Sequence, residues 1–122
     1  MKQPPLRQQL KRLENNDFGW ESAVAVWGAI IKGDIEEVKQ YLTLGEDVNL
    51  RGLGNMTPLH RAAQNGGKEM VELLIENGAD VNAMTDSGET PLDWAINKRH
   101  VKLYPQIRKH GGKTGEELIA DP

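Results

Sequence analysis

The stretch Asn55–Ala83, NMTPLHRAAQNGGKEMVELLIENGADVNA, contains the clearest local pattern in the chain and decides the fold. Thr57 is placed to N-cap a helix whose first residue, Pro58, loses nothing by lacking a backbone N–H. The pair Gly66–Gly67 ends this short helix, and Gly78 is a natural stop for a second helix that follows. The stretch therefore predicts two short helices joined by a tight turn.

Each of these helices carries one apolar face. The first face is built from small residues, and the second has larger residues at the i, i+3, i+4 spacing of a helix. The residues concerned are Leu59, Ala62 and Ala63, followed by Val71, Leu74 and Ile75. Such a unit leaves an apolar face that only a neighbouring unit can bury.

This stretch resembles an ankyrin repeat, a unit of about 33 residues with two antiparallel helices, a β-turn and the signature T-P-L-H-x-A. The segment from Thr57 to Ala62, TPLHRA, matches every fixed position of that signature. The resemblance implies an all-α solenoid of helix-turn-helix units with β-turn or hairpin loops, which binds another protein instead of transforming a substrate. It also implies that His60 ties neighbouring repeats together by hydrogen bonding.

The same pattern recurs on both sides of the central unit at an interval of 33 residues. The preceding copy has Val24-Ala25 in place of the Thr-Pro start, as expected for a terminal repeat. In the following copy the segment Thr90–Ala95, TPLDWA, repeats the signature with Asp93 in the place of His60. We divide the chain into an N-terminal capping segment (1–21), three repeats (22–54, 55–87 and 88–113) and a C-terminal tail (114–122).

Further signals place helices in the terminal repeats. Asp34 with Glu37, and Thr114 with Glu117, have the spacing of a capping box. We expect the second helix of the third repeat to contain Val101, Tyr104 and Ile107 at helical spacing. Pro105 lies in this helix, and an interior proline costs about 3 kcal/mol, so the helix should start late, bend or be short.

Residues 1–21 precede the repeats and carry their own pattern. Leucines at helical spacing alternate with basic residues: Leu6, Arg7, Leu10, Lys11, Arg12 and Leu13. One interpretation is a short amphipathic helix that seals the open edge of the first repeat. The other is an arm that folds onto a partner with the leucines as anchors.

Length and composition fit one small domain. The chain has 122 residues, 38% of them hydrophobic, and a net charge of −3, which indicates neither a nucleic-acid nor a membrane partner. It has no cysteine, so disulfides and thiolate metal sites are excluded. The longest apolar run, Ala23–Ile31, is far short of the ~20 residues that cross a bilayer, and no signal-peptide pattern is found. The cytoplasm is the expected location.

No pattern indicates catalysis, a cofactor or a metal. The histidines, at positions 60, 100 and 110, show no metal-ligand spacing, and neither Ser22 nor Ser87 lies in a G-x-S-x-G elbow. The segment Gly112–Thr114 superficially matches a phosphate-binding loop, but Ile107 stands where that loop needs a glycine. We therefore expect a protein that is not an enzyme.

The expected binding surface comprises the inter-repeat turns and the exposed face of the first helix in each pair, which line the concave side of a solenoid. Around the first turn these residues are Arg51, Leu53, Met56, Arg61, Gln64 and Asn65; around the second they are Met84, Asp86, Ser87, Glu89, Trp94, Asn97 and Lys98. Leu53, Met56 and Trp94 stand out, because exposed apolar groups and tryptophan are common among binding hot spots. Local packing is the alternative role for all three.

Charge is unevenly distributed along the chain. Acidic residues dominate from Glu14 to Leu50, whereas the segment Trp94–Gly115 has basic residues and no acidic one. Solvated end faces explain this, but the basic third repeat (98–113) also gives an alternative function, the binding of nucleic acid or another polyanion. Its aromatic content is sparse, with Tyr104 alone beyond Trp94, so a protein partner is favoured. We expect a monomer, with weak head-to-tail association of the acidic and basic ends as the alternative.

Overall fold

The computed structural model describes residues 19–120, so the expectations for the leucine-containing segment up to residue 18 lie outside the described residues. Between residues 19 and 120 the chain forms seven α-helices and a short 3-10 helix, with no strand, and the all-α prediction is confirmed. The helices are α2 (Gly19–Lys32), α3 (Ile35–Thr43), α4 (Pro58–Asn65), α5 (Lys68–Glu76), α6 (Pro91–Asn97), α7 (Leu103–Lys109) and α8 (Gly115–Ala120), with the 3-10 helix at Leu53–Asn55.

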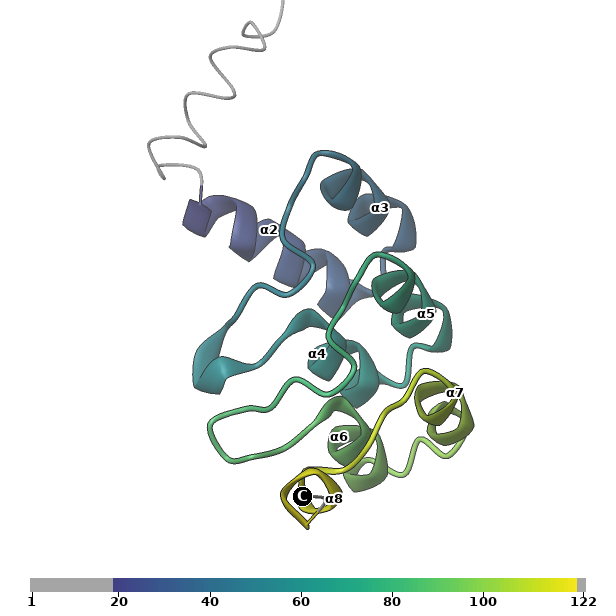
Figure 1. Cartoon of the computed structure of the whole chain (residues 1–122). Helices are drawn as coiled ribbons and strands as arrows, with labels where there is room; N and C mark the ends of the chain where they lie inside the picture. Colours follow the sequence, from purple (N-terminus) through teal and green to yellow (C-terminus); the bar gives the residue numbers. More distant parts are fainter. Residues whose placement is uncertain (1–18, 121–122) are drawn as a thin grey trace, which may run out of the picture.

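The helices are arranged in two rows (Figure 1). Helices α2, α4 and α6 form the inner row, α3, α5 and α7 form the outer row, and the loops between repeats project to the side of the inner row. The inner helices contact one another in sequence order, α2 with α4 and α4 with α6. Helix α8 lies beside α6 at the C-terminal end (Figure 1).

The two Thr-Pro starts form the predicted helix caps. Thr57 Oγ1 accepts a hydrogen bond from the backbone N–H of His60, while His60 Nδ1 accepts from the N–H of Thr57 at 3.1 Å. Asp93 replaces the imidazole in the third repeat, where its Oδ2 accepts from the N–H of Thr90 at 2.9 Å. The carboxylate therefore performs the same reciprocal capping as the histidine.

The first repeat lacks this start, and its inner helix differs accordingly. Helix α2 has 14 residues, against 8 in α4 and 7 in α6. Without a threonine cap and a proline at Val24-Ala25, nothing stops the helix from continuing toward the N-terminus. It begins at Gly19, within the segment 1–21 expected to form the cap.

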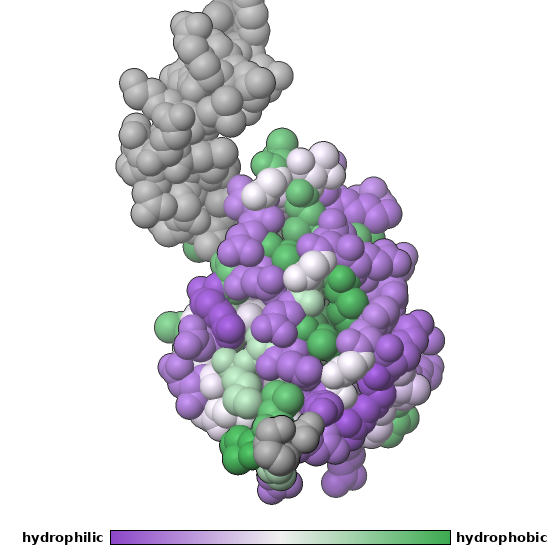
Figure 2. All heavy atoms as spheres, in the orientation of Figure 1, coloured by the Kyte–Doolittle hydropathy of each residue, from purple (hydrophilic) through white to green (hydrophobic). Residues whose placement is uncertain are grey.

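The predicted apolar faces form one continuous core. Leu59, Ala62, Ala63, Val71 and Leu74 are buried, and Ile75 packs against them partly exposed. Space-filling views show that hydrophilic residues cover most of one face of the molecule, with hydrophobic ones visible between them (Figure 2).

The second helix of the third repeat departs from the prediction. Helices α3 and α5 begin at Ile35 and Lys68, 33 residues apart, but α7 begins at Leu103, later than that interval predicts. With this start Pro105 falls in the first turn, where no intrahelical bond to its nitrogen is required, and the expected late start is confirmed. The predicted placement of Val101 in this helix is wrong: it precedes the helix, and its side chain is 61% exposed.

The two capping-box predictions differ in outcome. Thr114 and Glu117 exchange both hydrogen bonds at the start of α8. Asp34 accepts from the N–H of Glu37 at 3.1 Å, but the Glu37 carboxylate turns away to Tyr41 and Lys32. Only half of a capping box forms at α3, because the N–H of Asp34 already donates to the carbonyl of Ala29.

The turn after each inner helix uses a left-handed residue, with φ of 74° at Gly33 and 75° at Gly66 but 59° at Arg99. A residue with a side chain is strained by about 1–2 kcal/mol in this conformation. Replacing it with glycine removes the strain, but glycine loses more backbone entropy on folding, which offsets about half of the gain. We predict that Arg99→Gly raises the free energy of unfolding by about 0.5–1 kcal/mol in urea denaturation.

The matched reverse change is Gly33→Ala. Its Cβ would have no atom within 4 Å, so a loss of stability in this variant would report the backbone conformation alone. Equal stability of Arg99→Gly and the parent would contradict the idea that backbone strain is stored at Arg99.

Candidate partner-binding surface

The loops between repeats are ordered hairpin-like tips. In the first tip, residues 51–56, the N–H of Gly52 donates to the carbonyl of Met56 at 2.7 Å and encloses the 3-10 turn. In the second tip, residues 84–89, the N–H of Thr85 donates to the carbonyl of Glu89 at 2.9 Å. Each tip thus closes on itself and projects away from the inner helices (Figure 1).

The two tips are also bonded to each other. Arg51 Nη1 donates to the carbonyls of Asn55 at 2.7 Å and Met84 at 3.1 Å. The N–H of Asp86 donates to the carbonyl of Gly54 at 2.8 Å, and Asn55 Nδ2 donates to an Asp86 carboxylate oxygen at 3.1 Å. These contacts hold the tips in one arrangement, so little ordering entropy remains to be lost on binding.

His60 connects the inner helix of the second repeat to the second tip, as the resemblance implies. Because its Nδ1 accepts from the N–H of Thr57, the ring proton is on Nε2, which lies 2.8 Å from the carbonyl of Glu89 and donates to it. The side chain is fully buried. Burial is the main cause that lowers the pKa of His60, and the nearby Arg51 charge acts in the same direction.

A pocket of about 350 Å³ lies between α2, the first tip and α4. Three of its apolar side chains are largely exposed: Val24 at 60%, Ile31 at 55% and Leu53 at 92%. The Trp27 ring packs so closely on the first tip that a Cβ at Gly52 would lie 3.0 Å from it. The residues of this first-repeat pocket are Val24, Trp27, Ile31, Arg51, Gly52, Leu53, Met56 and Arg61.

The pocket unites some of the residues predicted from sequence and leaves others apart. Arg51, Leu53, Met56 and Arg61 meet in it. Trp94 lies elsewhere: its ring stands edge-on to His60 with centroids 5.3 Å apart, and its Nε1 donates to Glu89 at 3.0 Å. These contacts favour the alternative role for Trp94, local packing.

The remaining predicted residues divide between structural and solvent-facing positions. The carbonyl of Gln64 accepts from His100 Nε2 at 2.8 Å, and Asn65 Nδ2 donates to the carbonyl of Ile30 at 3.4 Å. Met84 is half-buried in the second tip. The exposed positions are Asp86, Ser87, Glu89, Asn97 and Lys98.

Sequence reasoning missed the contribution of α2 to the pocket. Val24, Trp27 and Ile31 are spaced along one side of the helix, while Val26, Ala29 and Ile30 form its buried side. The sequence did contain a signal for this: the run Ala23–Ile31 is apolar on more than one face of the helix, whereas packing on the core requires only one apolar face.

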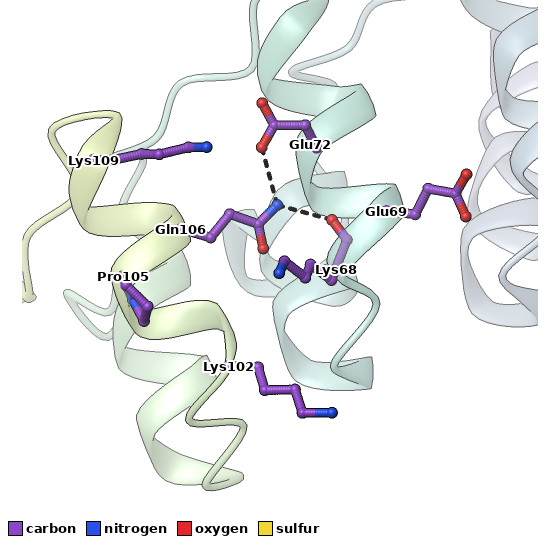
Figure 3. Close-up of a pocket in the computed structure, with 7 residues that line it drawn as sticks. All are labelled: Lys68, Glu69, Glu72, Lys102, Pro105, Gln106 and Lys109. Atoms are coloured by element: carbon purple, nitrogen blue, oxygen red, sulfur yellow. Dashed lines mark hydrogen bonds between the residues drawn. The ribbon is translucent and has the colours of Figure 1, made fainter.

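A larger groove of about 630 Å³ separates α5 from α7 on the outer row (Figure 3). Gln106 bridges its floor, with Nε2 donating to the carbonyl of Lys68 at 2.9 Å and to Glu72 at 3.0 Å. His110 Nε2 lies 3.2 Å from the same carboxylate, and the hydrogen bond from Gln106 is the main cause that lowers the pKa of Glu72. These contacts join the second and third repeats.

Several basic residues of the third repeat lie beside acidic groups. Lys102 and Lys109 line the outer groove together with acidic Glu69 and Glu72 (Figure 3). Arg108 forms a two-contact ion pair with Glu117, at 2.7 and 3.1 Å. Part of the positive charge of the predicted polyanion surface is thus neutralised.

Within residues 19–120, no group of histidine and carboxylate side chains could hold a metal ion, and no helix is long and apolar enough to span a bilayer. The described elements define the class of protein: a solenoid of helix pairs with projecting, mutually bonded tips.

Comparisons with known proteins identify the family. The model for ankyrin repeats (3 copies) matches residues 26–113. A putative ankyrin repeat protein of Rickettsia bellii is 37% identical over 95 residues, which cover 76% of this chain and 51% of that protein. The chain belongs to the ankyrin repeat family.

Other relatives share the repeats within different proteins. Serine/threonine-protein kinase 12 of Arabidopsis thaliana is 37% identical over 82 residues, 67% of this chain and 18% of the kinase. Human protein phosphatase 1 regulatory subunit 27 is 36% identical over 69 residues, 57% of this chain and 45% of that subunit. The chain thus spans about half or less of the length of these relatives.

Because His60 is buried with a lowered pKa, acid should destabilise the fold. In the unfolded chain the pKa of this histidine is about 6.5, so below that pH the unfolded state binds a proton that the folded state does not bind. The contribution of His60 to the free energy of unfolding is therefore fully present above about pH 6.5 and decreases below it. We predict that the free energy of unfolding, measured in urea, is lower by about 1 kcal/mol at about pH 5.5 than at about pH 7.5.

His60→Gln provides the control, because its stability should vary less over this pH range, whatever its absolute value. The Glu117 carboxyl, whose pKa is lowered to about 2, loses its contribution only in more acidic solution. A parent stability that is constant between the two pH values would contradict the buried neutral imidazole.

Proposed function

We propose that this chain is a non-catalytic module that binds a protein partner on its concave side, centred on the first-repeat pocket. The observation that carries the proposal is the meeting of Val24, Ile31 and Leu53, largely exposed apolar side chains from two separate elements, around one pocket. Solvent-exposed apolar side chains are ordinary when scattered, but a cluster of them marks an interaction site.

The free energy of burying these side chains is sufficient for a small interface. Full burial of one such aliphatic side chain contributes about 1.5–3 kcal/mol, from which the costs of association are subtracted. The bonded tips and the packed Trp27 ring reduce those costs, because the surface is already formed before the partner arrives.

The relatives support the same class of function. Ankyrin repeats are in general protein-interaction modules, and one relative is named as a regulatory subunit of protein phosphatase 1. The likeness to the plant kinase covers 18% of that protein and runs through the repeats, so it carries no catalytic role to this chain. We also propose a chain without cofactor that acts as a monomer in the cytoplasm.

The polyanion alternative has no comparable support. Two of its lysines share the outer groove with glutamates, and Arg108 is paired with a carboxylate. A head-to-tail association of chains would have to use the same partly neutralised charges.

The test compares Leu53→Asp with Leu44→Asp in affinity capture from a lysate of the source organism. Both leucines are exposed, at 92% and 69%, but Leu44 lies at the end of α3, outside the first-repeat pocket. We predict that the parent and Leu44→Asp capture the same protein, whereas Leu53→Asp loses it at least tenfold, because a buried carboxylate replaces an apolar contact.

Circular dichroism should show equal helix content in all three proteins, since neither leucine belongs to the core. Capture that survives Leu53→Asp would contradict the proposed site, and nucleic acid in the eluate that salt releases would favour the polyanion alternative.

A further inference from the structure

We propose that the partner segment held in the first-repeat pocket carries a carboxylate next to its apolar anchor. The inference rests on the proposed function, and it adds the chemistry of the partner. It follows from two arginines, Arg51 and Arg61, that line an otherwise apolar pocket.

Arg61 approaches the pocket from α4 with an unmet hydrogen-bonding group. Its Nη1 donates to Gln64 Oε1 at 2.7 Å, but its Nε is buried and has no acceptor. A buried N–H without an acceptor is unfavourable. Since the side chain is half-buried, its guanidinium can turn toward an arriving carboxylate, whose two oxygens match the planar fork that Nε forms with a terminal nitrogen.

Arg51 adds a positive charge at the mouth of the pocket. Its exposed side chain is held through Nη1 by the carbonyls of Asn55 and Met84, which are dipoles and leave the net charge in place. The guanidinium therefore stays beside Leu53 before any partner binds.

Neither arginine has a carboxylate partner in the described part of the chain. The ion pairs formed there by lysine and arginine involve Lys32, Lys39 and Arg108. Two guanidinium groups that lack a carboxylate partner lie beside exposed apolar carbons, which makes the pocket complementary to an apolar residue flanked by Asp or Glu. Such charge complementarity favours acidic partners over basic ones.

The same charges argue against another occupant, the chain's own first residues. Leu6 and Leu10 have basic neighbours, Arg7 and Lys11, whereas Leu13 is followed by Glu14. Residues 1–14 carry four basic residues against one acidic residue, so on balance they would bring like charge to Arg51 and Arg61. The favoured occupant is an acidic–apolar segment of a different protein.

The test is selection of binders from a displayed library of random peptides, using the full-length chain. We expect enriched peptides to combine a large apolar residue with Asp or Glu a few positions away. An enriched peptide, made with a fluorescent label, is then titrated against the parent, Leu53→Asp, Arg61→Gln and Lys39→Gln. Lys39, exposed on α3 and outside the pocket, provides the matched loss of charge.

We predict that Arg61→Gln weakens peptide binding about 10- to 100-fold, the range for losing a hydrogen bond to a charged group, while Lys39→Gln changes it less than about threefold. Arg61→Lys should recover only part of the loss, because it restores the charge without the fork. Affinity of the parent should fall as salt rises, and the salt dependence should be smaller in Arg61→Gln.

The contrary outcomes separate the two proposals. Peptides that need Leu53 but lack acidic residues and tolerate Arg61→Gln would overturn the carboxylate inference and leave the proposed function standing. Binding that survives Leu53→Asp, or a selection that enriches no peptide, would count against both. A rise in affinity above tenfold when Leu6, Leu10 and Leu13 are changed to Ser would show that the chain's own segment occupies the pocket.

Discussion

The structure depends on close approach between its inner helices. Ala29, Ala62 and Ala95 recur at an interval of 33 residues and are at most 1% exposed. A larger residue at these positions would push one inner helix away from the next and open the core of both repeats. Because no repeat buries its apolar face alone, the packing between repeats provides the stability of the solenoid.

The packing between repeats also determines how their loops contact one another. Repeats in constant register bring equivalent side chains to equivalent neighbours, as when Asn49 Nδ2 donates to the carbonyl of Gly78 and Asn82 Nδ2 to that of Gly111, at 3.1 and 3.0 Å. The same register brings Arg51 within reach of Met84 and joins the tips. The periodic core thus sets the arrangement of the tips that border the proposed binding surface.

Much of this was predictable from sequence, because caps and glycine stops are local. The Thr57 and Thr90 starts and the stop at Gly78 follow from short patterns, and the contact of His60 with the next tip was implied by the resemblance to ankyrin repeats. The error at Val101 arose because a proline four residues later moved the helix start. The pocket was only half predicted, since the exposed side of α2 becomes one of its walls only when the first tip folds beside it.

The most direct test of the account maps the captured partner onto the chain by NMR titration of the ¹⁵N-labelled protein. The account predicts that the indole N–H of Trp27 and the amides of the first tip shift first and most. It also predicts that the amides of α7, beside the outer groove, keep their positions. Shifts confined to α5 and α7, with the Trp27 indole unchanged, would contradict the account and place the binding surface on the outer row of helices.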